Sequence, residues 1–148
     1  MAIRTWVLAL LFAVGFIAGC SGPQHTAGTT DQDAPIGSEV IVVEMEPSQS
    51  DAYRMAGRVL QDHGFQIESS DSDLGSIRTA PFSNDDLFGP VRDVVLSVSV
   101  REGEVHLRGT YAGSTSITKR GQSGSPARKA WASMHMVAED MGVVAGYE

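Results

Sequence analysis

Cysteine is almost missing from this sequence, since Cys20 is the only one in 148 residues. A single cysteine excludes an intramolecular disulfide framework. The sequence also lacks the zinc-protease HExxH, the hydrolase GxSxG, the phosphate-binding loop and the redox CxxC. Apart from residues 6–17, no apolar stretch approaches the roughly 20 residues that a membrane-spanning helix needs. The sequence therefore shows no disulfide scaffold, no common catalytic signature and no membrane-spanning segment after residue 17.

Basic residues are in the minority, with 11 Lys and Arg against 18 Asp and Glu, which gives a net charge of −7. Binding of nucleic acid needs clustered basic residues, so we expect no nucleic-acid partner. The four histidines, His25, His63, His106 and His135, occur singly on separate segments. We expect no metal site, no cofactor and no catalytic centre, and we interpret His63 as a helix-end residue beside the last carbonyls.

Residues 1–19 have the three parts of an export signal. Arg4 supplies a positive start, residues 6–17 form an apolar run, and Ala18 and Gly19 are small residues before Cys20. The apolar run is too short for a mature transmembrane helix. We therefore predict a signal peptide over residues 1–19, removed by cleavage between Gly19 and Cys20.

The stretch Ile17-Ala18-Gly19-Cys20 resembles the lipobox of bacterial lipoproteins. The resemblance implies that the Cys20 thiol receives a diacylglyceryl group and that the new amine is acylated after cleavage, which anchors the chain to a membrane. Ser21 follows Cys20, and a residue other than Asp there resembles the pattern sorted to the outer membrane, with the domain in the periplasm. The alternative is an ordinary secretory signal followed by an incidental cysteine.

Residues 20–37 contain little besides Gly, Pro, Thr, Asp, Gln and other small or polar residues. Such a segment cannot bury enough apolar surface to offset the entropy lost on ordering. We predict a flexible tether over residues 20–37 and one folded domain over residues 38–148.

Hydrophobic periodicity within residues 38–148 predicts five strands and two helices. The expected strands are residues 39–45, 65–69, 74–80, 94–101 and 104–111, with a hairpin turn at Glu102-Gly103. One helix is expected from the Ser48 cap to Gly64, and another from Ser125-Pro126 to Gly142 with Trp131 on its apolar face. The predicted fold is α+β: one antiparallel sheet of about five strands with both helices on one face, in the order β-α-β-β-β-β-α.

Residues 112–125 are predicted to form a long polar loop. The loop holds the basic pair Lys119-Arg120 in an otherwise acidic domain. A loop of this length is either mobile or a contact site. We interpret Lys119 and Arg120 as a docking point for an acidic partner, and the alternative is two solvated charges.

The segment 47–79 carries a short helix ending at Gly64-Phe65, a strand, Asp71, and then Gly75-Ser76-Ile77-Arg78-Thr79. This pattern resembles the small domains of bacterial envelope lipoproteins, including the BamC family of outer-membrane β-barrel assembly, and of other small lipoproteins. The resemblance implies the fold and carries over no functional residue. We therefore expect a membrane-anchored, non-catalytic protein-binding or assembly module. The alternatives are a passive surface lipoprotein and a small envelope hydrolase.

Overall fold

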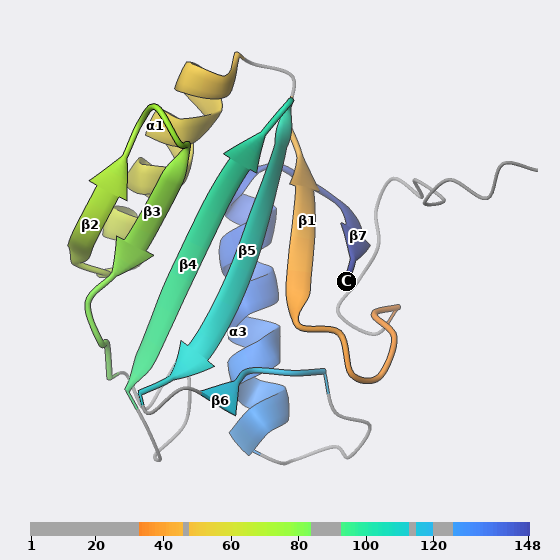
Figure 1. Cartoon of the computed structure of the whole chain (residues 1–148). Helices are drawn as coiled ribbons and strands as arrows, with labels where there is room; N and C mark the ends of the chain where they lie inside the picture. The colour runs from red at the N-terminus through yellow and green to blue at the C-terminus, as the bar shows by residue number, and fades with distance from the viewer. Residues whose placement is uncertain (1–32, 46–47, 84–92, 113–114, 120–125) are drawn as a thin grey trace, which may run out of the picture.

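The computed structural model describes residues 33–45, 48–83, 93–112, 115–119 and 126–148, except the side chains of residues 126 and 127. These residues form a single antiparallel sheet and two helices, as Figure 1 shows. The predicted α+β class is confirmed.

Within the described residues seven strands build the sheet, and its first strand in the sequence lies one place in from an edge. Their bounds are β1 Val40–Glu44, β2 Ile67–Asp71, β3 Ser76–Thr79, β4 Val94–Arg101, β5 Glu104–Tyr111, β6 Thr115–Ser116 and β7 Val143–Tyr147. The strand order is β2-β3-β4-β5-β1-β7, and β6 pairs with the end of β5. Strand β1 therefore lies between β5 and β7, in agreement with its apolar residues on both faces.

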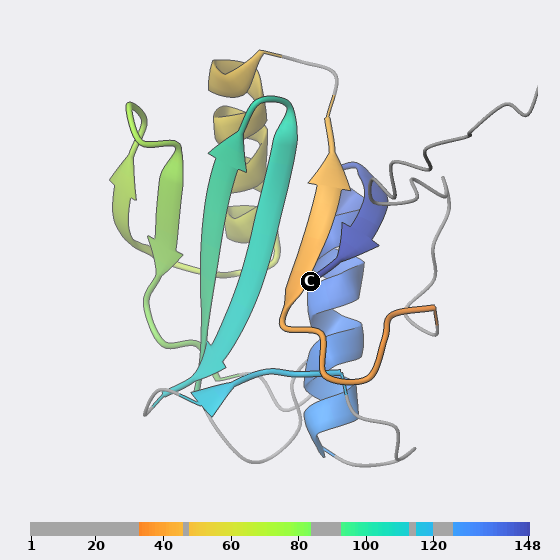
Figure 2. The same ribbon diagram turned by 45° about the vertical axis from the view of Figure 1, so that its right-hand side comes forward.

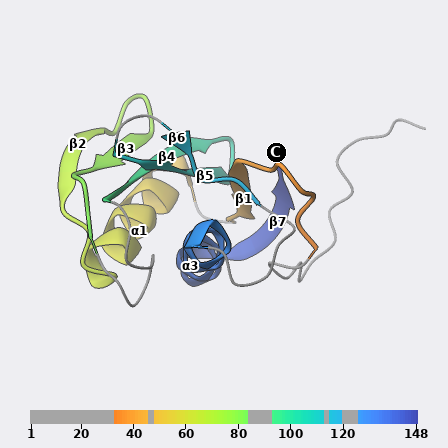
Figure 3. The same cartoon turned by 90° about the horizontal axis from the view of Figure 1, so that it is seen from below.

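Both helices cover the same face of the sheet, as the view along the strands in Figure 3 shows. Helix α1 spans Gln49–Asp62 and α3 spans Pro126–Met141. Their buried faces follow the predicted periodicity, with Ala52, Ala56 and Leu60 on α1 and with Trp131, Met134, Ala138 and Met141 on α3. The predicted placement of two helices on one face is confirmed.

Local signals set the ends of α1. The Ser48 hydroxyl accepts a hydrogen bond from the Asp51 N–H at 3.3 Å, which satisfies one donor of the first turn. Gly64 follows the helix with a φ of +86°, a conformation that glycine adopts without a steric cost. Phe65 then turns into the core and packs on Phe82, with ring centroids 4.6 Å apart.

Strand β7 was not predicted, and it raises the strand number above the expected five. Gly142 alone separates α3 from β7, so no polar turn marks the change from helix to strand. A Cβ at Gly142 would lie 2.9 Å from the carbonyl oxygen of Glu44, so this close passage requires glycine. A register shift between Val42 and Val43 also breaks the alternation that a regular strand would show.

The prediction of a long polar loop over residues 112–125 is wrong for residues 115–117. Thr115–Ser116 form β6, and Ile117 is fully buried. The Ile117 N–H donates to the Gly109 carbonyl oxygen at 2.8 Å. Residues 113–114 and 120–125 lie outside the described part of the chain.

The folded unit begins before the predicted boundary at residue 38. Ala34 is 5% exposed and belongs to the hydrophobic core. The Gly37 N–H donates to the Lys119 carbonyl oxygen (2.8 Å), and the Lys119 N–H donates to the Ser38 carbonyl oxygen (2.9 Å). Residues 34–37 are therefore part of the domain and not of a tether, while residues 20–32 lie outside the described residues.

The new boundary gives a matched pair of substitutions. Ala34→Asp places a carboxylate in the core and should lower the free energy of unfolding by about 2 kcal/mol or more. Ile36 is 77% exposed, so Ile36→Asp should change it by less than about 0.5 kcal/mol. Urea unfolding followed by circular dichroism measures both values. Equal stabilities of the two variants would show that residue 34 belongs to the tether and not to the domain.

Candidate functional site

The residues proposed for lipidation and partner binding fall mostly outside the described part of the chain. The structure does not describe Gly19, Cys20 or Arg120. Lys119 is described and is only 6% exposed, with its backbone bonded to residues 37 and 38. Lys119 is therefore not the exposed charge that the docking interpretation assumed, because its backbone hydrogen bonds hold it against the start of the domain.

Two of the described histidines form separate links between elements. His63 Nε2 lies 2.8 Å from Asp140 Oδ2, which joins the end of α1 to α3. This contact replaces the predicted interaction with the helix carbonyls. His106 on β5 faces outward, as predicted, with Nε2 3.3 Å from Glu104 Oε2 and Nδ1 3.7 Å from Glu148 Oε2.

His135 is buried beside aromatic rings at the other side of α3. Its Nε2 lies 2.8 Å from the Tyr147 hydroxyl, and its Nδ1 lies 3.4 Å from Glu139 Oε1. The Trp131 ring packs on Tyr147, with ring centroids 6.1 Å apart. The Nε1 of Trp131 is buried without a hydrogen-bond partner among the described residues. The three described histidines thus have three different sets of partners, and no group of three or more metal-binding side chains is found in residues that the structure describes.

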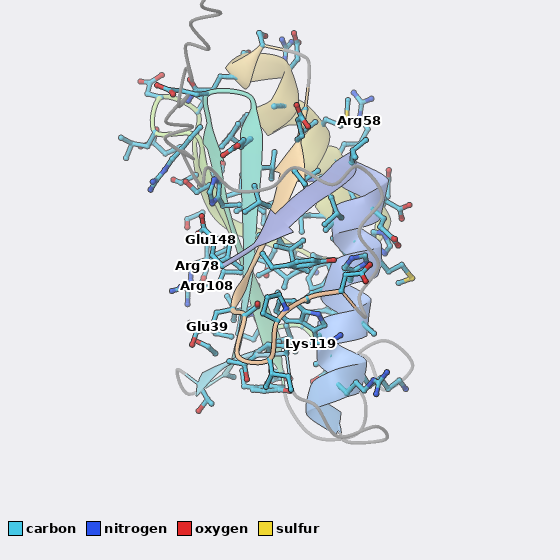
Figure 4. All side chains as sticks on the ribbon, turned by 90° about the vertical axis from the view of Figure 1, so that its right-hand side faces the viewer. Glu39, Arg58, Arg78, Arg108, Lys119 and Glu148 are labelled. Atoms are coloured by element: carbon cyan, nitrogen blue, oxygen red, sulfur yellow. The ribbon has the colours of Figure 1, made fainter. Side chains whose placement is uncertain are left out.

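The sheet face opposite the helices carries a shallow hollow of about 310 Å³. Cross-strand neighbours line it: Ser97 lies opposite Arg108, and Ser99 lies opposite His106. Figure 4 shows Arg78, Arg108, Glu39 and Glu148 on this side of the molecule, away from α3.

The charges on this open face pair with one another. Arg108 Nη2 lies 3.4 Å from Glu39 Oε2, and Arg78 Nε lies 3.4 Å from Glu68 Oε2. Exposed pairs of this kind contribute little to stability. The open face therefore offers hydrogen-bonding groups with nearly balanced charge.

A second hollow of about 360 Å³ runs between α1 and the edge strand β2, and we call it the helix–edge groove. Its lining residues come from α1, β2 and β3: Tyr53, Arg54, Gly57, Arg58, Gln61, Ile67, Ser70 and Ile77. Two of the eight are arginines and none is acidic, although the whole chain has a net charge of −7. The lining of the groove therefore combines the positive charge of its arginines with apolar side chains.

The helix–edge groove is not apparent from the sequence. Arg54 and Arg58 are four residues apart, a spacing that places both on one side of a helix. In β2 only Ile67 is apolar, and the other four residues are exposed, which is typical of an edge strand. These two signals were present, but their proximity depends on β2 folding back beside α1, so that residues of both elements line one groove. Figure 2 shows β2 at the outer edge of the sheet, beyond β3.

No helix in the described ranges is long and apolar enough to cross a membrane. Comparison of the sequence with protein-family models gave no match, and comparison with curated proteins gave none.

Proposed function

We propose that this protein is a lipid-anchored bacterial envelope lipoprotein whose domain binds a protein partner and does not act as an enzyme. The observation that carries the proposal is the lone Cys20 directly after Ile17-Ala18-Gly19 and the apolar run. The thioether on Cys20 and the acylated amine would supply the lipid chains, and each buried methylene contributes about 0.8 kcal/mol to membrane binding. An outer-membrane location with the domain in the periplasm is part of the proposal.

The arrangement of the domain supports binding as its role. Among the residues that the structure describes, the helices cover one face of the sheet and no strand pairs with the outer edge of β2. The other face and this edge are therefore surfaces on which a partner could bind. The described histidines support the folded structure through contacts with Asp140, Glu104 and Tyr147. Concave surfaces with polar groups on a rigid sheet are suited to recognition.

Photo-crosslinking in intact cells tests the binding role. A photoreactive amino acid would be placed, one position at a time, at the exposed apolar residues Ile36, Met55, Leu74, Met136 and Val143. We expect at least one position to give a discrete crosslinked protein in the membrane fraction, and the signal should decrease when Cys20→Ser removes the anchor. Absence of a crosslink from all five positions, or turnover of a substrate by the purified protein, would contradict the proposal.

A further inference from the structure

We infer that the helix–edge groove takes an extended, acidic segment of a partner protein, which adds to the sheet as a strand beside β2. This inference rests on the proposed function and deepens it, because it names the surface and the chemistry of the partner. Three parts of the groove support this inference: a free sheet edge, apolar walls and a positive charge without an ion-pair partner among the described residues.

The free edge is the first part. Strand β2 pairs with β3, and within the described sheet it has no neighbour on its other side. The register shift between Ile67 and Ser69 is confined to one end, so Ser69, Ser70 and Asp71 pair regularly with β3. A strand edge of this kind presents alternate N–H and C=O groups that an extended peptide can pair with.

The walls of the groove are the second part. Ser70 lies opposite Ile77, and Ile77 packs under α1, so the groove lies on the helix-covered side of the sheet. Tyr53 and Ile67 are only partly buried and leave apolar surface along it. Successive side chains of a strand point to opposite faces, so every second side chain of an added peptide would point into the groove.

The charge is the third part. Arg54 Nη2 is paired with Asp51 Oδ1 at 2.8 Å, whereas Arg58 is exposed and forms no ion pair with the residues that the structure describes. Figure 4 shows Arg58 on the outer side of α1. An acidic side chain in the groove would therefore meet a guanidinium that is free to pair in the bidentate geometry that carboxylates favour. The side chains that line the groove include two arginines and no carboxylate, so the groove favours an acidic segment over a basic one.

The test uses the full chain in detergent micelles and a synthetic seven-residue peptide. The peptide has threonine at its odd positions and valine, glutamate and valine at the second, fourth and sixth, so that the last three can face the groove together. We expect saturable binding by fluorescence anisotropy. Replacing glutamate by lysine in the peptide should weaken binding at least about tenfold, because an attraction becomes a repulsion.

Two protein variants with equal net charge locate the site. Arg58→Glu should weaken binding of the acidic peptide at least about tenfold. Arg101→Glu is the matched control, because Arg101 is exposed and lines the hollow of the open face, not the groove, and it should change the affinity less than about twofold. Circular dichroism confirms that both variants are folded. Equal affinities of the two variants would overturn the proposal.

Methylation of the peptide backbone separates strand addition from simple charge attraction. Alternate N–H groups of a strand point to the same edge, so methylating either the odd or the even amides blocks one edge only. We expect one pattern to abolish binding and the other to preserve it, and equal effects of the two patterns would contradict strand addition.

Two other occupants have their own signatures, and each would overturn the inference. Self-association of the chain that Arg58→Glu abolishes would assign the groove to a second copy. The sequence also carries the acidic pair Asp85-Asp86 between β3 and β4. Peptide binding that appears only after Asp85→Asn and Asp86→Asn would assign the groove to that segment of the same chain. These measurements do not depend on lipidation or on a cellular partner, so their failure is distinguishable from failure of the proposed function.

Discussion

Replacing Cys20 by alanine is expected to abolish lipid labelling of the protein completely. Cells grown with radiolabelled palmitate should incorporate label into the wild-type protein and none into Cys20→Ala, because Cys20 is the only thiol in the chain. Without the thioether, the signal should also remain uncleaved, so the variant should be longer by residues 1–19. Electrophoresis with autoradiography measures both effects.

Ser21→Ala is the matched control for this substitution. Like Cys20→Ala, it removes one heavy atom from a small side chain, but it leaves the Cys20 thiol and the small residues before it intact. We expect normal labelling and normal cleavage. Persistent palmitate incorporation in Cys20→Ala, or loss of label in Ser21→Ala, would show that the lipobox interpretation is wrong.

Trp131→Ala is expected to cause the largest loss of stability in the domain. Trp131 is fully buried where α3 packs on the sheet, and its ring contacts Tyr147. Removing a side chain of this size from a core costs about 3–5 kcal/mol. Since small domains are stable by only about 5–15 kcal/mol, the variant should unfold at a much lower urea concentration, measured by far-ultraviolet circular dichroism.

Trp131→Phe is the control for packing. Phenylalanine keeps an aromatic ring and removes the indole N–H, which is buried without a hydrogen-bond partner among the described residues. Removal of an unsatisfied buried donor is favourable, so the loss should be clearly smaller than for alanine. Equal losses for the two variants, or an unchanged midpoint for alanine, would contradict the packing that we describe.

The main elements of the fold could be predicted because local signals agreed with the final packing. The Ser48 cap and Gly64 bound α1, and the alternating residues of β4 and β5 bound the long hairpin. The predicted turn at Glu102-Gly103 is confirmed, with φ values of +42° and +90°. At these positions propensity, periodicity and turn chemistry all indicate the same structure.

The elements that were missed depend on partners distant in the sequence. Strand β7 is defined by its pairing with β1 and by a close passage at Gly142, neither of which leaves a periodic pattern. Residues 115–119 look polar, yet Ile117 is buried because the segment continues the sheet beside β5. Ala34 enters the core for a similar reason, because backbone bonds at Gly37 and Ser38 hold the preceding residues against the domain.

The candidate binding groove could not be predicted from sequence because it depends on strand order. Arg58 was visible as a helical arginine and Ser70 as part of a polar turn. Only the order β2-β3-β4 places β2 at an edge, and only the position of α1 places that edge beside Arg58. Of the two docking residues that the sequence suggested, Lys119 is buried in another region, and Arg120 lies outside the described residues.

The measurement that most directly tests the central claim is mass spectrometry of the N-terminal peptide of the mature protein, isolated from membranes. The account predicts a peptide that begins at Cys20 and carries a diacylglyceryl thioether together with an acyl chain on the new amine. A mature protein in the soluble fraction with an unmodified Cys20, or one that begins at another residue, would contradict it.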